Sequence, residues 1–321
     1  MRRILAADMG GTNCRMGFFE LPPDADAPRL LDIARLKTAE VGSFAELLVR
    51  LFSRPRPFGP QECHLAVLAV PGPVRQGFCQ PPNIPWSIDL ADAARAGFGD
   101  SELINDFAAQ AHACRCGAME GVEALQPGNV DPEGAVAVIG AGTGLGHCAL
   151  VRFGRGALAV PSEAGHAAFP FVHDWEHAYG LWVREETGLA YCHGDAIVTG
   201  GGLARLYSYL SGVRATPREA AAALPQVPEV VERFARFYGR AARNYALYVL
   251  ATGGVYITGG VSGRNPELVR HPAFLDEFRA SPSHSELLAR MPVFLNLNQD
   301  AGLYGAAQYA AQRLEGFGAM C

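Results

Sequence analysis

The sequence lacks the features that mark several large protein classes. Its Lys and Arg residues are scattered rather than clustered and the net charge is −5, which argues against a basic nucleic-acid surface. The most apolar stretch, 245–257, is shorter than the roughly 20 residues of a membrane-spanning helix and is interrupted by glycines. A Walker A Gly-Lys-Ser/Thr segment and a protein-kinase catalytic loop are also missing. We therefore expect no nucleic-acid partner and no membrane association.

Cysteine is present without any paired spacing. The eight cysteines are dispersed, and Cys114 and Cys116 have no second pair at the spacing of zinc ligands. Only Ile4 to Ala7 are apolar before Asp8, whereas a secretory signal needs an apolar core of roughly 7–15 residues. We expect reduced thiols and no structural metal.

The 321 residues are enough for about two domains, and 49% hydrophobic with 18% charged residues is ordinary for a globular chain. Two similar series of elements follow one another along the chain. The first series predicts strands and helices at 3–7, 14–19, 30–37, 43–52, 65–70, 87–95 and 101–105. The second predicts them at 135–139, 147–152, 157–160, 174–187, 201–210, 228–252, 255–257, 293–295 and 301–313. Each series opens with a hairpin, which predicts two related α/β lobes with a cleft between them.

The turn of each hairpin is rich in glycine and contains a threonine. Asp8-Met9-Gly10-Gly11-Thr12-Asn13 lies between two strands, so it is not a dinucleotide fingerprint, which requires a helix N-terminus. Residues 140–146, with four glycines and Thr143, repeat this arrangement. Glycines allow a ligand to approach the backbone and its N–H groups closely. The alternative is a pair of plain tight hairpins, but their repetition favours phosphate binding, with Asp8 placed to hold a hydrated Mg²⁺.

Further glycines and polar residues extend this pattern. A glycine cluster at 253–260 fits either a planar ligand lying against the backbone or a helix end followed by a strand. Glu163 and His166 have metal-site spacing, but Pro161 and Gly165 disfavour a helix there. A loop that presents a carboxylate and an imidazole suits a ligand with many hydroxyl groups, to which Asn83 could add an amide. For Trp86, nearby in the sequence, we expect a core position.

Asn105 and Asp106 stand where a buried strand gives way to a helix. An Asx residue at this position can cap the helix. Asp106 can also act as a base toward a bound substrate, and the two roles are compatible.

Together these motifs resemble the bacterial glucokinase family, hexokinase-like kinases on the two-lobed actin-like ATPase (ribonuclease H-like) fold with a duplicated mixed sheet and an interlobe cleft. The pieces occur in family order along essentially the whole chain: 8–13, 72–86, 104–107, 140–146, 163–166 and 253–260. The resemblance implies a small lobe of residues 1–110 plus 299–321, a large lobe of 111–298, and a cytoplasmic homodimer.

The resemblance also implies a role for each matched residue. Asp106 becomes the catalytic base on the 6-hydroxyl of a hexose. The sugar-binding residues would be Asn83, Asn105, Asp106, Glu163, His166 and Asp195. ATP would be held by Asp8, Gly10, Gly11, Thr12, Asn13, Gly140, Gly142, Thr143, Gly144, Gly259 and Gly260. Mg²⁺ would be held at Asp8 through water. The implied reaction is phosphorylation of glucose by ATP to glucose 6-phosphate.

Some residues depart from the family pattern. Asp195 stands where the family has a glutamate that contacts the sugar, and Pro81-Pro82 replace Leu-Thr before Asn83. Ala164 replaces a glycine. These differences leave open a kinase for another hexose, such as mannose or an amino sugar. They also leave open a sugar sensor that binds without phosphoryl transfer.

Overall fold

The computed structural model describes residues 1–23, 25, 27–116 and 120–316, which form two compact units. The first unit comprises Met1–Glu120, Arg152–Ala159 and Asn298–Cys321, and the second Gly121–Val151 and Val160–Leu297. Cys321 and the final residues of the expected small lobe, 317–321, lie outside the described residues.

The first unit is built on a five-stranded sheet of order β3-β2-β1-β4-β7. Its strands are β1 Arg2–Met9, β2 Asn13–Leu21, β3 Arg29–Lys37, β4 Leu65–Val70 and β7 Ser101–Asn105. The first three are antiparallel neighbours, whereas β4 and β7 run parallel to β1. The ends of β1, β4 and β7 therefore meet at one edge of the sheet.

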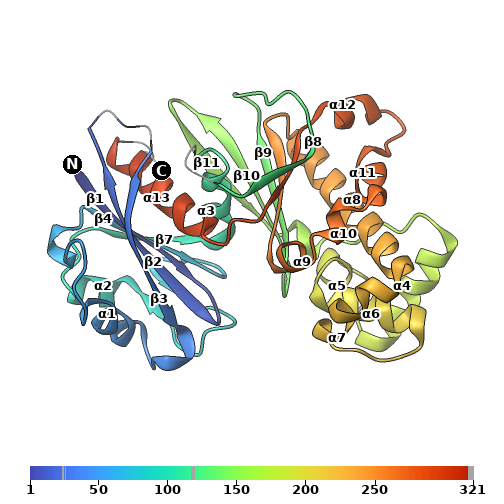
Figure 1. Cartoon of the computed structure of the whole chain (residues 1–321), viewed down its shortest axis with the longest axis horizontal. Helices are drawn as coiled ribbons and strands as arrows, with labels where there is room; N and C mark the ends of the chain where they lie inside the picture. The colour runs from blue at the N-terminus through green and yellow to red at the C-terminus, as the bar shows by residue number, and fades with distance from the viewer. Residues whose placement is uncertain (24, 26, 117–119, 317–321) are drawn as a thin grey trace. The chain divides into compact units, whose positions relative to one another are not determined.

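Helices cover both faces of this sheet because side chains alternate along each strand. Leu5 and Ala7 of β1 pack in one apolar cluster together with α1 (Phe44–Phe52), whereas Ile4 and Ala6 pack with α13 (Ala301–Leu314). Figure 1 shows α1 and α2 (Leu90–Arg95) on one side of the sheet, with α13 and α3 (Asp106–Ala113) on the other. The remaining elements are the short strands and 3-10 turns β5 Phe78–Cys79, β6 Ile88–Asp89, η1 Thr38–Glu40 and η2 Pro60–Glu62.

The second unit repeats this plan with a six-stranded sheet of order β11-β10-β9-β12-β13-β8. Its strands are β8 Val122–Gln126, β9 Val136–Ala141, β10 Leu145–Phe153, β11 Gly156–Ser162, β12 Gly254–Thr258 and β13 Val293–Asn296. Here β12 and β13 run parallel to β9, as β4 and β7 do to β1. Two mixed sheets that each contain a hairpin and two strands parallel to its first strand confirm the expected α/β fold with an internal duplication.

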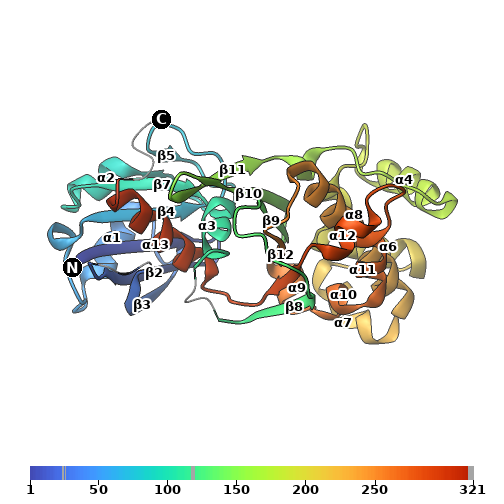
Figure 2. The ribbon, with the colours of Figure 1, turned by 90° about the horizontal axis from the view of Figure 1, so that it is seen from above.

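The helices of the second unit gather around α8, which packs next to the sheet (Figures 1 and 2). The longer ones are α4 Asp174–Thr187, α6 Gly200–Ser211, α7 Pro217–Ala223, α8 Pro228–Val249 and α11 Pro272–Arg279. The shorter ones are η3 Ala164–His166, α5 Gly194–Ile197, η4 Leu224–Gln226, α9 Gly260–Arg264, α10 Glu267–Arg270 and α12 Ser285–Arg290.

Several expected boundaries were wrong for local reasons. The helix expected at 87–95 begins at Leu90, because Asp89 caps it and Ile88 pairs with Cys79 in a small sheet. The helix expected at 228–252 ends at Val249, because Leu250 adopts a left-handed φ of 50° before the glycines are reached. Strand β8 and helices α7 and α10–α12 were not expected. A Thr216-Pro217-x-Glu219 capping box precedes α7 and is a sequence signal that could have identified it.

Candidate functional site

In the first glycine turn, some backbone groups form internal hydrogen bonds and others are exposed. The N–H of Gly10 donates to the carbonyl of Asn13 at 3.0 Å, which closes the turn. Thr38, fully buried, donates through its hydroxyl to the carbonyl of Gly10 at 2.7 Å. Gly11 and Thr12 remain exposed, and within the described residues no acceptor is bonded to their N–H groups. These two N–H groups can therefore bind an anion.

Asn83 lies against this turn from another part of the first unit. A Cβ atom at Gly11 would lie 2.9 Å from both the Cβ and the carbonyl oxygen of Asn83, so only glycine allows this approach. The Trp86 side chain is in the core, where its indole N–H donates to the carbonyl of Val41 at 3.1 Å. The core role expected for Trp86 is confirmed.

Asp8, near the end of β1, belongs to a network of alternating charges. Arg15 donates to its Oδ2 at 3.0 Å and approaches Asp300 at 3.3 Å, while Arg35 pairs with Asp300 at 2.7 Å. Burial raises the pKa of Asp8, and Arg15 opposes that rise. Sequence reasoning missed Arg15 and Asp300. Arg15 pairs with Asp8 across the hairpin register, which the sequence pattern could have indicated, whereas nothing local points to Asp300.

Helix α3 begins with Asn105 as its cap and Asp106 as its first residue. It starts at the edge of the sheet where β1 ends. The side chain of Asn105 accepts the N–H of Phe107 at 2.9 Å and donates to the carbonyl of Gly72 at 3.3 Å. The helix-cap role is therefore confirmed. Asp106 accepts the same N–H at 3.0 Å, which orients its carboxylate. Burial, reinforced by the negative charge of Asp8, raises the pKa of Asp106 to about 7.

The second glycine turn, in the second unit, is also closed by an internal backbone hydrogen bond and also exposes N–H groups. The N–H of Gly142 donates to the carbonyl of Gly144 at 2.8 Å, and the carbonyl of Gly142 accepts the N–H of Gly200 at 3.0 Å. Gly140 lies inside β9, paired with Gly146 and Thr258, so its backbone is in the sheet. Thr143 is exposed, and in the described part of the chain no acceptor meets the N–H groups of Thr143 and Gly144.

Gly259 and Gly260 lie at the same sheet edge as this turn, because β9 and β12 are parallel neighbours. Gly259 has a φ of 92°, and a Cβ atom there would lie 2.5 Å from the carbonyl oxygen of Ala141. A side chain at Gly259 is thus excluded by both backbone conformation and space. The cluster brings two backbone segments into direct contact.

Glu163, His166 and Asp195 come together in the second unit. The Nε2 atom of His166 lies 3.8 Å from Glu163 and 3.9 Å from Asp195. Glu163 and His166 are exposed, on a 3-10 turn rather than an α-helix, as Pro161 and Gly165 suggested. Asp195 is more buried, and its Oδ1 accepts the N–H of Leu145 at 2.8 Å. The three side chains form one polar group with two exposed members.

The candidate residues therefore fall into two sets. Within the first unit the structure brings together Asp8, the turn at 10–13, Asn83, Asn105 and Asp106. Within the second it brings together the turn at 140–146, Glu163, His166, Asp195, Gly259 and Gly260.

The residues around Asp8 fit a magnesium ion held mainly by water and phosphate. Among the described residues, no group of three or more His, Cys, Asp or Glu side chains could hold a metal ion directly. Mg²⁺ commonly keeps several waters and uses one or two carboxylates together with substrate phosphates. Asp8, next to the exposed N–H groups of Gly11 and Thr12, matches that mode.

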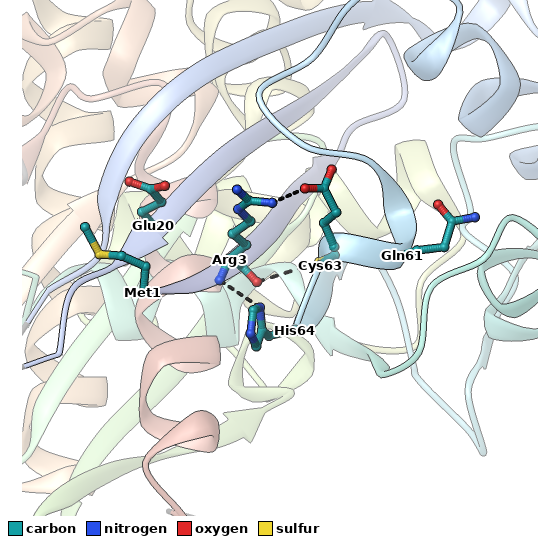
Figure 3. Close-up of a pocket in the computed structure, with 7 residues that line it drawn as sticks. Met1, Arg3, Glu20, Gln61, Cys63 and His64 are labelled. Atoms are coloured by element: carbon teal, nitrogen blue, oxygen red, sulfur yellow. Dashed lines mark hydrogen bonds and ion pairs between the residues drawn. The ribbon is translucent and has the colours of Figure 1, made fainter.

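Three hollows on the described surface are lined by residues other than the candidates. A hollow of about 490 Å³ in the first unit is lined by Arg3, Glu62, Cys63, His64 and three further residues (Figure 3). Arg3 pairs with Glu62 there, and burial raises the pKa of the Cys63 thiol to about 11. Paired charges and a protonated thiol leave little chemistry at this surface.

In the described part of the chain, no helix has both the length and the apolarity to cross a membrane.

The sequence comparisons agree on one family, and the solved structures share the fold. A family model described as Glucokinase matches residues 5–313. A glucokinase from Sinorhizobium fredii is 32% identical over 324 residues, covering 96% of this chain and 91% of that protein. The crystal structure of a glucokinase from an Antarctic psychrotroph superposes with a TM-score of 0.85 at 26% identity, covering 97% and 99% of the two chains. A ROK-family glucokinase from Streptomyces griseus, solved with glucose and AMPPNP, has a TM-score of 0.59 at 19% identity, covering 97% and 99%.

Proposed function

The chain belongs to the glucokinase family, and on that basis we propose that it transfers the terminal phosphoryl group of ATP to the 6-hydroxyl of a hexose, with glucose as the first candidate. The observation that carries the proposal is the position of Asp106 together with its pKa. It starts a helix at the same sheet edge as Asp8, in the unit that contains the first glycine turn. Its raised pKa, about 7, lies close to neutral pH, where a general base works best.

The sugar would be bound by residues of both sets. Asp106 would accept the proton of the reacting hydroxyl, and its bond to Phe107 holds the carboxylate in place. Asn83, Asn105, Glu163, His166 and Asp195 would bind the remaining hydroxyls. Each sugar hydroxyl both donates and accepts, so carboxylates, amides and imidazoles are suitable partners. A site of this kind rejects analogues that lack a hydroxyl, because its own groups would be left unpaired.

ATP would be bound by the two glycine turns and the third glycine cluster. The free N–H groups of Gly11 and Thr12, and those of Thr143 and Gly144, support contacts with phosphate oxygens. Gly259 and Gly260 would lie against the adenosine. Gly10, Asn13, Gly140 and Gly142 would act through the shape of the turns, since their backbone groups are engaged internally or in the sheets. Mg²⁺, held through water at Asp8, would neutralise negative charge on the phosphates.

The decisive experiment measures ADP release with a panel of hexoses at saturating ATP and Mg²⁺. Turnover that is fastest with glucose, and lost in the Asp106→Ala variant, supports the proposal. Absence of turnover with every hexose would refute it. If calorimetry then detected sugar binding without turnover, the chain would be a sugar sensor.

A kinase for another hexose is the second candidate, and Asp195 favours testing it. One oxygen of this carboxylate is already bonded to the N–H of Leu145, so its capacity for sugar contacts is reduced. The same panel, with mannose and amino sugars included, separates the candidates by the ratio of their kcat/KM values.

Three further proposals follow from the family rather than from the site. The lobes would be 1–110 with 299–321, and 111–298; the chain would form a homodimer; and it would act in the cytoplasm. Light scattering coupled to size-exclusion chromatography tests the dimer. Limited proteolysis tests the lobe boundaries, and cell fractionation tests the location.

A further inference from the structure

Tyr238 connects the ends of two strands in the second unit. It lies on α8 and its side chain is fully buried. Its hydroxyl accepts the N–H of Ala141 at 3.1 Å and donates to the carbonyl oxygen of Thr258 at 3.3 Å. Ala141 is the last residue of β9 and Thr258 the last residue of β12. One side chain therefore holds both strands at the point where they leave the sheet.

The position matters because the sheet itself no longer connects these segments. The pairing of β9 with β12 ends at Gly140 and Thr258. Beyond these residues, β9 continues into the second glycine turn and β12 continues into Gly259-Gly260. Ala141 is fully buried, and the Tyr238 hydroxyl holds its N–H group at the point where the pairing of the two strands ends.

Two further contacts would hold these strand ends together if the hydroxyl of Tyr238 were removed. Ser262 donates to the carbonyl of Thr258 at 2.9 Å, so Thr258 has a second partner. Gly259 stands directly against Ala141, where no Cβ atom would fit. Removal of the Tyr238 hydroxyl would thus take one hydrogen bond from each strand end while the packing of the two segments remains. Burial raises the pKa of this phenol, so both hydrogen bonds persist at neutral pH.

We propose that Tyr238 is a positioning residue of the nucleotide site, which fixes the spacing between the turn at 142–144 and the segment Gly259-Gly260. The inference rests on the proposed function, in which the turn binds phosphates and the glycine segment lies against adenosine. A nucleotide spans both segments and depends on their spacing. A ligand that touches one segment alone does not depend on it. Preorganised spacing improves affinity because less ordering is needed when the ligand binds.

The test compares three ligands on the wild type and on Tyr238→Phe, which keeps the ring and removes only the hydroxyl. The ligands are ADP, adenosine and inorganic tripolyphosphate, with affinities measured by calorimetry or competition. We expect the Kd of ADP to rise on the order of tenfold, because the two hydrogen bonds that set the spacing of the segments are lost. The Kd values of adenosine and tripolyphosphate should change less than about twofold. In turnover, the KM for ATP should rise while kcat changes little.

Tyr179→Phe is the matched control. Tyr179 is also fully buried in the second unit, and its hydroxyl donates to the carbonyl of Gly202 at 3.5 Å rather than to either segment. This variant should bind all three ligands as the wild type does. If Tyr238→Phe does not fold, amide hydrogen exchange on the wild type replaces it: ADP should protect the N–H of Ala141 more than adenosine or tripolyphosphate does, and equal protection by all three ligands would overturn the positioning role.

The outcomes separate the inference from the function on which it rests. A wild-type protein that binds neither ADP nor ATP contradicts the proposed function. A wild type that binds ADP while Tyr238→Phe binds it equally well contradicts the inference alone. Equal weakening for all three ligands would mean general loosening of the unit, and it also overturns the positioning role.

Discussion

The Oδ1 atom of Asp195 accepts the backbone N–H of Leu145 at 2.8 Å, although 50 residues separate the two in the sequence. Leu145 lies in the second glycine turn, as the first residue of β10, and Asp195 approaches His166 at 3.9 Å through its other oxygen. Gly165 completes the junction, since a Cβ atom there would lie 2.1 Å from the carbonyl oxygen of Leu145 and 2.6 Å from Asp195. The proposed phosphate turn and the proposed sugar loop of the second unit thus share one carboxylate.

Substitutions of Asp195 should separate these two tasks. Asp195→Asn keeps an oxygen that can accept from Leu145 but loses the charge, so we expect weaker sugar binding and an unchanged KM for ATP. Asp195→Ala leaves the N–H of Leu145 unpaired, which costs about 1–3 kcal/mol, and should raise both KM values. Steady-state kinetics with each substrate varied provides the measurement. Equal KM values for ATP in the two variants would contradict the shared role.

Replacement of Asp106 by Asn should abolish most of the activity while sugar binding persists. The amide has nearly the same shape but cannot take up the hydroxyl proton, and loss of a general base lowers kcat by about 10²–10⁴-fold. Calorimetry should give a sugar Kd close to the wild-type value. A kcat within about threefold of wild type would exclude Asp106 as the base. In the wild type, kcat/KM should fall as the pH decreases through about 7, because the carboxylate becomes protonated.

The same variant should be more stable than the wild type at alkaline pH. The pKa of Asp106 rises from the ordinary aspartate value of 3.8 to about 7 in the fold, so the native state binds the proton more tightly than the unfolded state does. The stability of the wild type should therefore decrease as the pH rises from about 4 to about 7. Three pKa units correspond to at most about 4 kcal/mol, and partial solvent access reduces this figure.

Thermal unfolding of the two proteins at pH 5 and pH 8 measures this effect. The Tm of the wild type should fall more between the two pH values than the Tm of Asp106→Asn. Parallel pH dependence in the two proteins would mean that Asp106 is not held in an unfavourable charged state.

Removal of a buried arginine should strongly destabilise the second unit. Arg240 on α8 is fully buried, donates to both carboxylate oxygens of Glu176 and reaches Glu277 at 2.9 Å. It also donates to the carbonyl of Pro170, in the segment after the proposed sugar loop. Arg240→Met would leave the Glu176 carboxylate buried without its cation and should cost about 3–5 kcal/mol.

Arg236→Met on the same helix is the matched control for this prediction. Arg236 pairs with Glu232 at 3.0 Å, one helical turn away and partly exposed to solvent. Such a pair contributes about 0.3–0.5 kcal/mol. Urea unfolding of both variants gives the comparison. Similar losses in the two variants would show that the buried network contributes no more than a surface pair.

Local patterns in the sequence predicted a large part of the secondary structure. Strand 65–70, strand 101–105 and helix 174–187 were placed with the bounds that the structure has. Strand 65–70 is a continuous apolar run, strand 101–105 contains the apolar pair Leu103-Ile104, and helix 174–187 has the three-to-four spacing of a helix; each of these patterns depends only on neighbouring residues. The cap at Asn105 was predictable for the same reason, since its partner is Phe107. Boundaries failed where a distant strand or a left-handed residue decided them, as at Ile88 and Leu250.

The sequence by itself determined the duplicated α/β plan, the two glycine turns and the family, because these depend on residue types at short and regular spacings. Only the tertiary structure decided which backbone groups of the turns remain free, that Asp195 is bonded to Leu145, that Arg15 connects Asp8 to Asp300, and that Tyr238 bridges two strand ends. The physical reason is that hydrogen bonds act over about 3 Å, whatever the separation along the chain. Partners 50 or 97 residues apart, such as Asp195 with Leu145 and Tyr238 with Ala141, leave no periodic trace in the sequence.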